Sequence, residues 1–261
     1  MNDKLHFLKD IAINAGSILT TLFRKEFDIE GKQGRELVTT ADRKSEEFII
    51  SSIRKKYPEA GVVAEESNLK EWERNEVFIV DPLDGTNNFS YGIPFFCVSL
   101  AYELEGNLKI GVIYDPIHKE LFSAQKGRGA KLNGNPISVS NRDKLIDSIL
   151  ATGFPYIRRL REYSKISEFS KFLMEARGIR RFGSAALDLA YVACGRLDGF
   201  WEKKLKPWDI SAGGLLVREA GGRVSNFYKL EWNYRKDHII ASNGKIHSEM
   251  LKIIKRAKRV D

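Results

Sequence analysis

The chain contains 261 residues, of which 43% are hydrophobic and 30% are charged. A chain of this length and composition can bury a sizeable core, which excludes intrinsically disordered, collagen-like and disulfide-stapled proteins. No apolar run reaches the roughly 18 residues of a membrane span, and Asp3, Lys4, Lys9 and Asp10 interrupt the N-terminal segment, unlike a signal peptide. We therefore expect a soluble, cytoplasmic protein with no membrane association.

The formal net charge is +8, from 43 Lys and Arg against 35 Asp and Glu. Basic residues gather in 153–181 and in 252–259. We interpret these runs as solvated helix faces, with an anionic partner such as RNA as the alternative. Cys97 and Cys194 lie among apolar residues, which predicts packing rather than a disulfide or a thiolate metal site.

Hydrophobic periodicity predicts two helices in the first quarter of the chain. Apolar residues recur at three- and four-residue spacing over 4–24, and a second stripe runs over 42–56 until Pro58 stops it. Two short apolar runs follow, at 61–66 and 77–81, and each ends in acidic residues. We interpret these runs as strands that deliver carboxylates at their C-terminal ends.

The pattern then changes to extended runs separated by turn signals. From 95 to 139 these runs predict an antiparallel meander, with a hairpin at Asn133-Gly134-Asn135. Beyond about residue 145 strands and helices alternate. The strands are predicted at 148–154, 180–183, 198–202, 223–227 and 238–242, and the helices at 161–176, 184–195, 208–220 and 245–258.

This change of rhythm near 140–148 predicts two layered subdomains that share a cleft. The first, 1–145, is an N-terminal α+β subdomain that carries the acidic motifs. The second, 146–261, is a C-terminal α/β subdomain. The fold class predicted for the whole chain is therefore α+β.

The most informative segment is IVDPLDGTNNF at 79–89, which follows a hydrophobic strand. Pro82 fixes the backbone so that the carboxylates of Asp81 and Asp84 and the carbonyl of Leu83 can turn toward one point. Hard oxygen ligands of this kind suit Mg²⁺. The alternative is an ordinary Asp-Pro turn followed by an Asp-Gly turn.

Residues next to this segment and elsewhere in the chain favour the metal interpretation. Gly85 permits close backbone approach, and Thr86 presents an N–H and a hydroxyl at the start of a helical turn, where phosphate is well received. Glu65 and Glu66 end the preceding strand, and Asp209 is placed to open a helix, where it could serve merely as an N-cap. Separated acids at strand ends and helix starts are what two or three divalent ions need to share carboxylates.

Three segments together resemble the signatures of the inositol monophosphatase family: AEES at 64–67, DPLDGTNNF at 81–89 and WDISAGGLLVREAGG at 208–222. The resemblance covers nearly the whole chain. It implies a layered αβαβα sandwich of the inositol monophosphatase and fructose bisphosphatase type. It also implies a magnesium-dependent, lithium-sensitive phosphomonoesterase with two or three Mg²⁺ ions per active site, usually a homodimer.

The resemblance also assigns the metal ligands and the residues that aim the attacking water. Glu65, Asp81 and the Leu83 carbonyl match the first metal site, Asp81, Asp84 and Asp209 match the second, and Glu65 faces a third, weaker ion. The catalytic positions are Glu65, Thr86 and Asp42, where Asp42 pairs with Thr86. A helix-start cap is the alternative role of Asp42.

On the substrate side, the resemblance implies contacts from two regions of the chain. The matching positions are Asp84, Gly85, Thr86, Gly183, Ser184, Ala185 and Glu202. Lys32 matches a lysine of a loop near the third metal. We expect Leu187, Leu189 and Val192 to be core residues, Trp201 and Trp208 to pack in the cleft wall, and no histidine to be catalytic.

The predicted reaction is direct in-line hydrolysis of inositol 1-phosphate by an activated water, without a covalent phosphoenzyme. One alternative keeps the chemistry and changes the substrate to fructose 1,6-bisphosphate or a broader range of sugar phosphates. A further alternative is a protein that binds RNA or a transcription complex, with which the charge of +8 is compatible.

Overall fold

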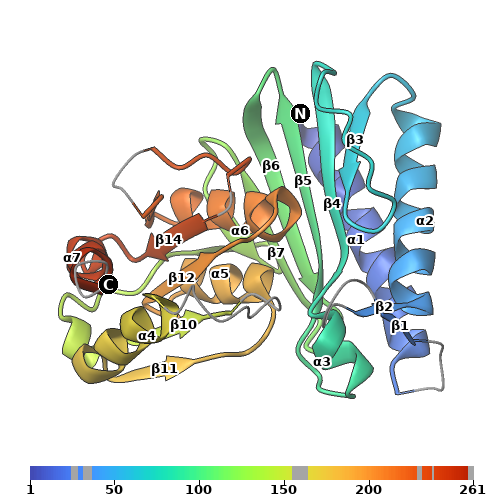
Figure 1. The fold of residues 1–261 in the computed structure, drawn as a ribbon. Coiled ribbons are helices and arrows are strands. Elements are labelled where there is room, and N and C mark those ends of the chain that lie inside the picture. The colour runs from blue at the N-terminus through green and yellow to red at the C-terminus, as the bar shows by residue number, and fades with distance from the viewer. Residues whose placement is uncertain (25–28, 32–36, 155–163, 228–230, 237, 258–261) are drawn as a thin grey trace.

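The computed structural model describes residues 1–24, 29–31, 37–154, 164–227, 231–236 and 238–257. Within these ranges two large β-sheets alternate with three layers of helices, which confirms the predicted αβαβα sandwich (Figure 1). Lys32 and part of the basic run at 153–181 lie outside the described residues. No helix in the described part of the chain is both long enough and apolar enough to cross a membrane.

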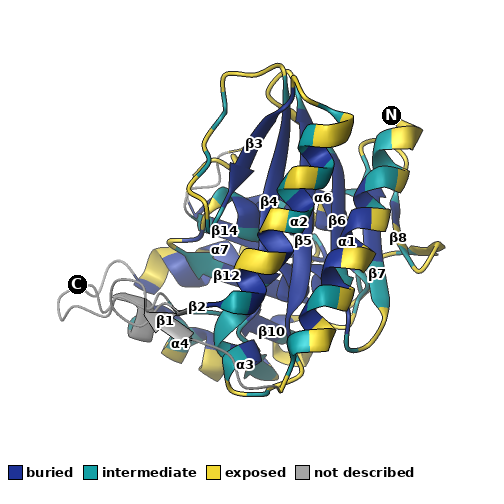
Figure 2. Ribbon diagram, turned by 90° about the vertical axis from the view of Figure 1, so that its right-hand side faces the viewer, coloured by how far each residue is buried: buried dark blue, intermediate teal, exposed yellow. Residues whose placement is uncertain are grey.

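The first layer consists of helices α1 (Asn2–Leu22) and α2 (Thr40–Lys56), which pack against each other and against one face of the larger sheet. Both helices are buried along the side that faces the sheet and exposed along the outer side (Figure 2). The periodicity therefore predicted both helices. Helix α2 begins at Thr40 rather than at Asp42, because the Thr39 hydroxyl accepts the first free backbone N–H groups.

The larger sheet has seven strands in sequential order. Strands β3 and β4 are parallel, and each later neighbour is antiparallel, which confirms the predicted meander. The hairpin predicted at Asn133-Gly134-Asn135 forms with a two-residue loop, and Asn133 and Gly134 both have the positive φ that such a loop favours. The strands are β3 (Gly61–Ala64), β4 (Glu76–Asp84), β5 (Cys97–Leu104), β6 (Asn107–Asp115), β7 (Glu120–Gln125), β8 (Ala130–Leu132) and β9 (Asn135–Ile137).

The middle layer consists of helices α5 (Ala185–Ala193) and α6 (Pro207–Glu219), which contact strands of both sheets. Gly111 of β6 permits close approach, because a Cβ there would lie 2.8 Å from the Ala212 carbonyl oxygen of α6. As expected, Leu187, Leu189 and Val192 are fully buried. One apolar cluster therefore runs through this layer and joins the two sheets.

The smaller sheet has the strand order β11-β10-β12-β14-β13 and carries helices α4 (Ser164–Glu175) and α7 (His247–Ala257) on its outer side (Figure 1). Trp201 stacks on Phe172 in the apolar cluster of this side. The strands are β10 (Ile149–Thr152), β11 (Gly178–Arg180), β12 (Gly199–Lys203), β13 (Arg223–Ser225) and β14 (His238–Ser242).

One predicted strand in this half was misplaced. The strand expected at 180–183 lies at 178–180, where it pairs in parallel with β10. The chain leaves the sheet before Gly183, whose φ of 91° is incompatible with a strand. The division into 1–145 and 146–261 stays a prediction.

Three short elements, two strands and a helix, lie near the end of β4. Strands β1 (Ile29–Gly31) and β2 (Leu37–Thr39) form a two-stranded antiparallel sheet that leads into α2. Helix α3 (Thr86–Ser90) follows β4 directly and contacts β2.

Candidate functional site

The parallel pairing of β3 and β4 brings two predicted ligands to one sheet edge. Ala64 of β3 pairs with Val80 of β4, so the next residues of the two segments, Glu65 and Asp81, lie side by side. Carboxyl ends of parallel strands share one edge, whereas antiparallel pairing would have separated these acids. The two predicted acidic runs therefore converge because of strand direction.

A β-bulge re-aims the chain between the two aspartates of the central motif. Asp81 lies opposite Ser99 of β5, but Asp84 lies opposite Cys97, so β4 contains one extra residue. The Leu83 amide donates to Oδ1 of Asp81 over 3.1 Å, which holds the carboxylate against the bend. Gly85, with φ of 98°, then turns the chain into α3.

The third acid arrives from the middle layer. The Ser99 hydroxyl donates to the Trp208 carbonyl over 3.2 Å and thereby ties the start of α6 to the strand position opposite Asp81. Asp209 does not open the helix, contrary to expectation: α6 begins at Pro207, and Asp209 is its third residue. Its Oδ2 accepts the backbone N–H of Lys206 over 2.6 Å, so the side chain satisfies a free donor at the N-terminus of α6.

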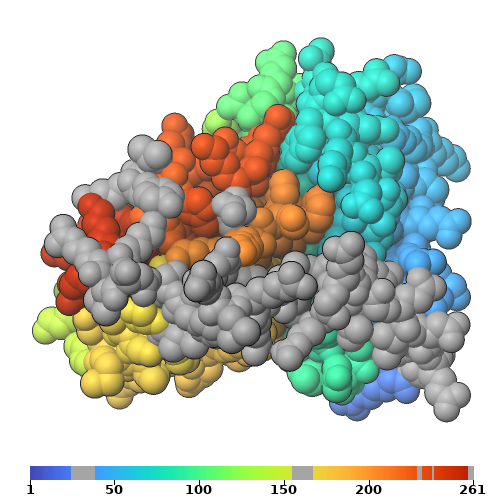
Figure 3. All heavy atoms as spheres, in the orientation of Figure 1, coloured from blue at the N-terminus to red at the C-terminus, as the bar shows by residue number. Residues whose placement is uncertain are grey.

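These three elements assemble one acidic group in the described chain. One carboxylate oxygen from each of Glu65, Asp81 and Asp209 lies within 4.8 Å of the other two. In the space-filling view, the start of α6 lies beside the chain around β3 and β4 (Figure 3). Burial raises the pKa of Asp81 well above its ordinary value, and Glu65, Asp84 and Asp209 raise it further. An all-oxygen donor set that repels itself in this way fits a divalent cation such as Mg²⁺.

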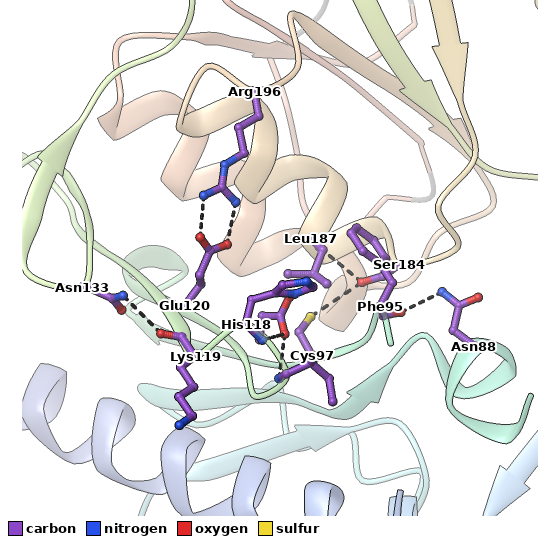
Figure 4. Close-up of polar contacts among 12 residues, drawn as sticks. Asn88, Phe95, Cys97, His118, Lys119, Glu120, Asn133, Ser184, Leu187 and Arg196 are labelled. Atoms are coloured by element: carbon purple, nitrogen blue, oxygen red, sulfur yellow. Dashed lines mark hydrogen bonds and ion pairs between the residues drawn. The ribbon is translucent and has the colours of Figure 1, made fainter. Parts of the chain in front are cut away.

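Asp84 lies near this group but turns one oxygen toward α5. Its Oδ2 accepts the Ser184 hydroxyl over 2.6 Å and the Ala186 amide over 2.7 Å, and this oxygen is therefore committed. The Cys97 sulfur is 4.0 Å from Oδ2 and 3.7 Å from the Ser184 oxygen, and Cys97 and Ser184 face each other in Figure 4. Burial raises the pKa of Asp84 to about 6, and the bonds from Ser184 and Ala186 oppose the shift. Its predicted role as a metal ligand stays a prediction.

Asp42 and Thr86 meet as predicted, although 44 residues separate them in sequence. The Thr86 hydroxyl lies 3.0 Å from Oδ1 of Asp42 and 3.1 Å from the Leu83 carbonyl oxygen. The other oxygen of Asp42 accepts the Thr39 amide, so Asp42 also caps α2 from its third position. Burial raises the pKa of Asp42, and the bonds from Thr39 and Thr86 oppose the shift.

The substrate-side residues are positioned from α3 and β12. The Asn88 side-chain amide donates to the carbonyls of Phe95 and Phe182, each over 2.7 Å, and thereby holds the segment that contains Gly183 (Figure 4 shows the Phe95 bond). Ser184 caps α5 by accepting the Leu187 amide. This segment therefore reaches Asp84 through fixed backbone.

Glu202 lies on β12, next to Gly153. A Cβ on Gly153 would lie 2.2 Å from Oε2 of Glu202, so the carboxylate packs directly against that glycine. Asp188 of α5 is 2% exposed, and its Oδ1 has no hydrogen-bond partner among the described residues. Burial raises the pKa of Asp188 well above its ordinary value, and Glu202 and Asp84 raise it further.

Four further residues near the site were not predicted from sequence. Ser99 positions α6 and Asn88 positions the Gly183 segment. Glu46 accepts the two amides that follow Glu65, and Asp188 is close enough to Glu202 and Asp84 for their charges to help raise its pKa. A buried polar position within an apolar strand was the available signal for Ser99. Asp188 occurs in the apolar stretch SAALDLAY, where a carboxylate is costly and could have been noticed.

The inositol monophosphatase family profile matches residues 2–259. The chain is 41% identical over 254 residues to the Nus factor SuhB of Escherichia coli K12, covering 95% of each protein. It is 40% identical over 255 residues to the inositol-1-monophosphatase of Mesorhizobium japonicum, covering 97% of this chain and 96% of that protein.

A solved structure agrees with these matches. The Thermotoga maritima IMPase superposes with a TM-score of 0.90 at 35% identity, covering 99% of each chain. Membership of such a family supports phosphatase activity. Sequence, fold and the family profile together show that this chain belongs to the inositol monophosphatase family.

Proposed function

We propose that the protein is a magnesium-dependent phosphomonoesterase that hydrolyses inositol 1-phosphate to inositol and phosphate. The observation that carries the proposal is the convergence of Glu65, Asp81 and Asp209 within 4.8 Å, beside a bent segment that ends in Gly85 and Thr86. A relative that shares 40% of its residues is named inositol-1-monophosphatase, which favours this substrate over other phosphate esters. We also propose a cytoplasmic homodimer and inhibition by lithium.

The acidic group would hold the cations. Glu65, Asp81, the Leu83 carbonyl, Asp84 and Asp209 would bind two or three Mg²⁺ ions. Bound Mg²⁺ supplies positive charge that offsets the charge of the phosphate and makes water more acidic. Burial and then repulsion from Glu65, Asp84 and Asp209 raise the pKa of Asp81, and the charge of a bound cation would offset that repulsion.

The surrounding residues aim the attacking water and the ester. Asp42 fixes the Thr86 hydroxyl, and Glu65 lies at the end of β3, beside Asp81. Thr86 and Glu65 could therefore orient a water for in-line attack on phosphorus. A nucleophilic side chain is not needed in this scheme, and no phosphoenzyme forms. The amides of Gly85 and Thr86 would receive phosphate oxygens.

The alcohol half would contact the Gly183, Ser184 and Ala185 segment and Glu202. A carboxylate accepts hydrogen bonds from hydroxyls and donates none when ionised, so Glu202 suits a polyol such as inositol. The same feature fits a sugar, which leaves fructose 1,6-bisphosphate and other sugar phosphates as alternative substrates.

A phosphate-release screen tests the proposal. Inositol 1-phosphate, fructose 1,6-bisphosphate and an aryl phosphate are offered with Mg²⁺ and, as a control, with EDTA. We expect Mg²⁺-dependent release with the largest kcat/KM on inositol 1-phosphate. A larger kcat/KM on fructose 1,6-bisphosphate would show that the bisphosphate, not inositol 1-phosphate, is the preferred substrate. No phosphate release from any ester would overturn the proposal.

A second candidate function is binding to RNA or a transcription complex. The relatives named Nus factor SuhB and the charge of +8 favour it. Binding through Lys and Arg contacts to phosphates weakens steeply with salt. Salt-dependent binding of a structured RNA that persists in Asp84→Asn would support this function, because that variant removes a predicted metal ligand and leaves the basic surface intact.

A further inference from the structure

Helix α2 presents three buried polar side chains on one face, and each contacts a different part of the candidate site. Ser45 and Glu46 follow Asp42 by three and four residues, which places all three on one face of the helix. Asp42 is 1% exposed, Ser45 0% and Glu46 4%. Asp42 accepts a hydrogen bond from Thr86, as described above. The Ser45 hydroxyl donates to the Pro82 carbonyl over 2.9 Å, at the bend of the central motif.

Glu46 contacts the third part, the turn after β3. Its Oε2 accepts the Glu66 amide over 2.8 Å, and its Oε1 accepts the Ser67 amide over 2.7 Å. Both oxygens of a nearly inaccessible carboxylate are thus spent on two successive backbone N–H groups. Bonds between a charged carboxylate and amides are stronger than neutral ones, and they fix the turn against the helix.

The position of this turn matters because Glu65 lies beyond the strand ladder. Strand β3 ends at Ala64, whose amide bonds to the Leu69 carbonyl across the base of the turn. Within the turn, Glu46 accepts the amides of the two residues directly after Glu65. Helix α2 therefore holds the backbone directly after Glu65 in place, and its Asp42 and Ser45 also hold the Thr86 hydroxyl and the bend at Pro82.

We propose that Glu46 is a positioning residue for the predicted metal ligand Glu65. It fixes the turn so that the Glu65 carboxylate meets Asp81 and Asp209 at the spacing a divalent cation needs. The inference rests on the proposed metal-dependent function. Groups that hold metal ligands in place typically contribute about 10–100-fold to metal affinity.

The variant Glu46→Gln tests this role. A carboxamide keeps one acceptor oxygen but turns an NH₂ group toward the other amide, so one bond is lost and two donors face each other. The matched control is Glu219→Gln. Glu219 accepts the amides of Gly127, Arg128 and Gly129 over 2.9–3.1 Å, at the far end of α6 from Asp209.

Two readouts are measured on the intact protein: Mg²⁺ binding by calorimetry, and the Mg²⁺ dependence of phosphate release. We expect Glu46→Gln to weaken Mg²⁺ binding about 10-fold and to raise the half-activating Mg²⁺ concentration by the same factor. At saturating Mg²⁺, the KM for the ester and kcat should recover to within about threefold of wild type. We expect Glu219→Gln to leave both Mg²⁺ readouts unchanged, even where it lowers the melting temperature.

Unchanged Mg²⁺ affinity in Glu46→Gln would overturn the inference, and so would equal weakening in Glu219→Gln, which would indicate general loosening. If Glu46→Gln does not fold, Glu46→Asp replaces it, since Asp keeps the buried charge but is one methylene too short to reach both amides. A wild-type protein that binds Mg²⁺ without hydrolysing any ester would contradict the proposed function, while weakened binding in Glu46→Gln would still support the positioning role. A wild-type protein that binds no Mg²⁺ would overturn both.

Discussion

The Thr86 hydroxyl and Oδ1 of Asp42 lie 3.0 Å apart, which joins the start of α3 to the first turn of α2. Thr86→Val keeps the shape of the side chain but removes the hydroxyl. We expect kcat/KM for inositol 1-phosphate to fall about 100-fold, because a water would lose a group that orients it. Thr86→Ser keeps the hydroxyl and should stay within about tenfold of wild type. Retained activity in Thr86→Val would refute this role of the pair.

Asp209→Asn separates the ligand role from the helix-end role. Asn keeps an oxygen that can accept the Lys206 amide, so the melting temperature in EDTA should change little. Loss of a negative charge beside Asp81 should nevertheless lower Mg²⁺-dependent activity by about 1,000-fold or more. Circular dichroism melts and steady-state rates check the two halves. Activity near wild type would mean that Asp209 only stabilises the N-terminus of α6 and is not a metal ligand.

Local patterns predicted most of the elements, because strand alternation, helix stripes and turn residues act over short spans. Gly85 and Thr86 were predicted at the turn where the structure places them, since a positive φ after a strand favours glycine. Asp209 was misplaced within its helix. The helix begins at Pro207, and the acid at its third position accepts the N–H of Lys206, the residue before the helix. An N-cap side chain would instead accept an N–H from the second or third helical residue, so both arrangements satisfy free donors of the first turn and local sequence does not distinguish them.

The supporting contacts of the site could not be predicted, because they depend on which surfaces pack together. Glu46 occurs in the charged stretch DRKSEE, which indicates a solvated helix face, yet the turn after β3 covers it. The meeting of Glu65 with Asp81 depended on the parallel register, which neither strand encodes alone. Asn88 holds two distant carbonyls that only the folded chain brings together.

Asp188→Asn tests the cost of a buried carboxyl. Burial, Glu202 and Asp84 raise its folded-state pKa, while Arg181 opposes them. A raised pKa means that the folded protein prefers the neutral form of Asp188. The contribution of Asp188 to the free energy of unfolding is therefore fully present below the unfolded pKa of about 3.9, and it is lost as pH rises through the folded-state pKa. Asn cannot ionise. Urea unfolding in EDTA should show Asp188→Asn more stable than wild type at pH 8, with a smaller difference at pH 4. A difference that does not vary with pH would contradict the shift.

His247 gives the opposite dependence on pH. It is fully buried, and each ring nitrogen lies 2.9 Å from a serine hydroxyl, of Ser225 and Ser242. Burial, together with the nearby positive charge of Arg223, lowers its pKa to about 4. The folded protein prefers the neutral ring, so stability present above the unfolded pKa of about 6.5 is lost as pH falls toward 4.

The loss attributable to His247 should be about 3 kcal/mol of unfolding free energy between pH 7 and pH 4. Carboxyl groups also titrate in this range, but they do so equally in His247→Gln, which lacks the imidazole. Subtracting the urea-unfolding profiles of the two proteins isolates the contribution of His247. Parallel profiles would show that the imidazole does not resist protonation in the folded protein.

Glu202 distinguishes recognition of the alcohol from the chemistry at phosphorus. If its carboxylate accepts hydrogen bonds from inositol hydroxyls, Glu202→Ala should cost about 1.5–3 kcal/mol in kcat/KM for each lost charge-assisted bond. An aryl phosphate has no such hydroxyls, and its hydrolysis should be nearly unchanged, because activation of water depends on Glu65, Asp81 and Thr86. Glu202→Gln is the matched control, since it retains an acceptor oxygen beside Gly153 and should lose less. Equal losses on both substrates would mean that Glu202 supports the acidic group or the fold, and β12 would then have no part in substrate choice.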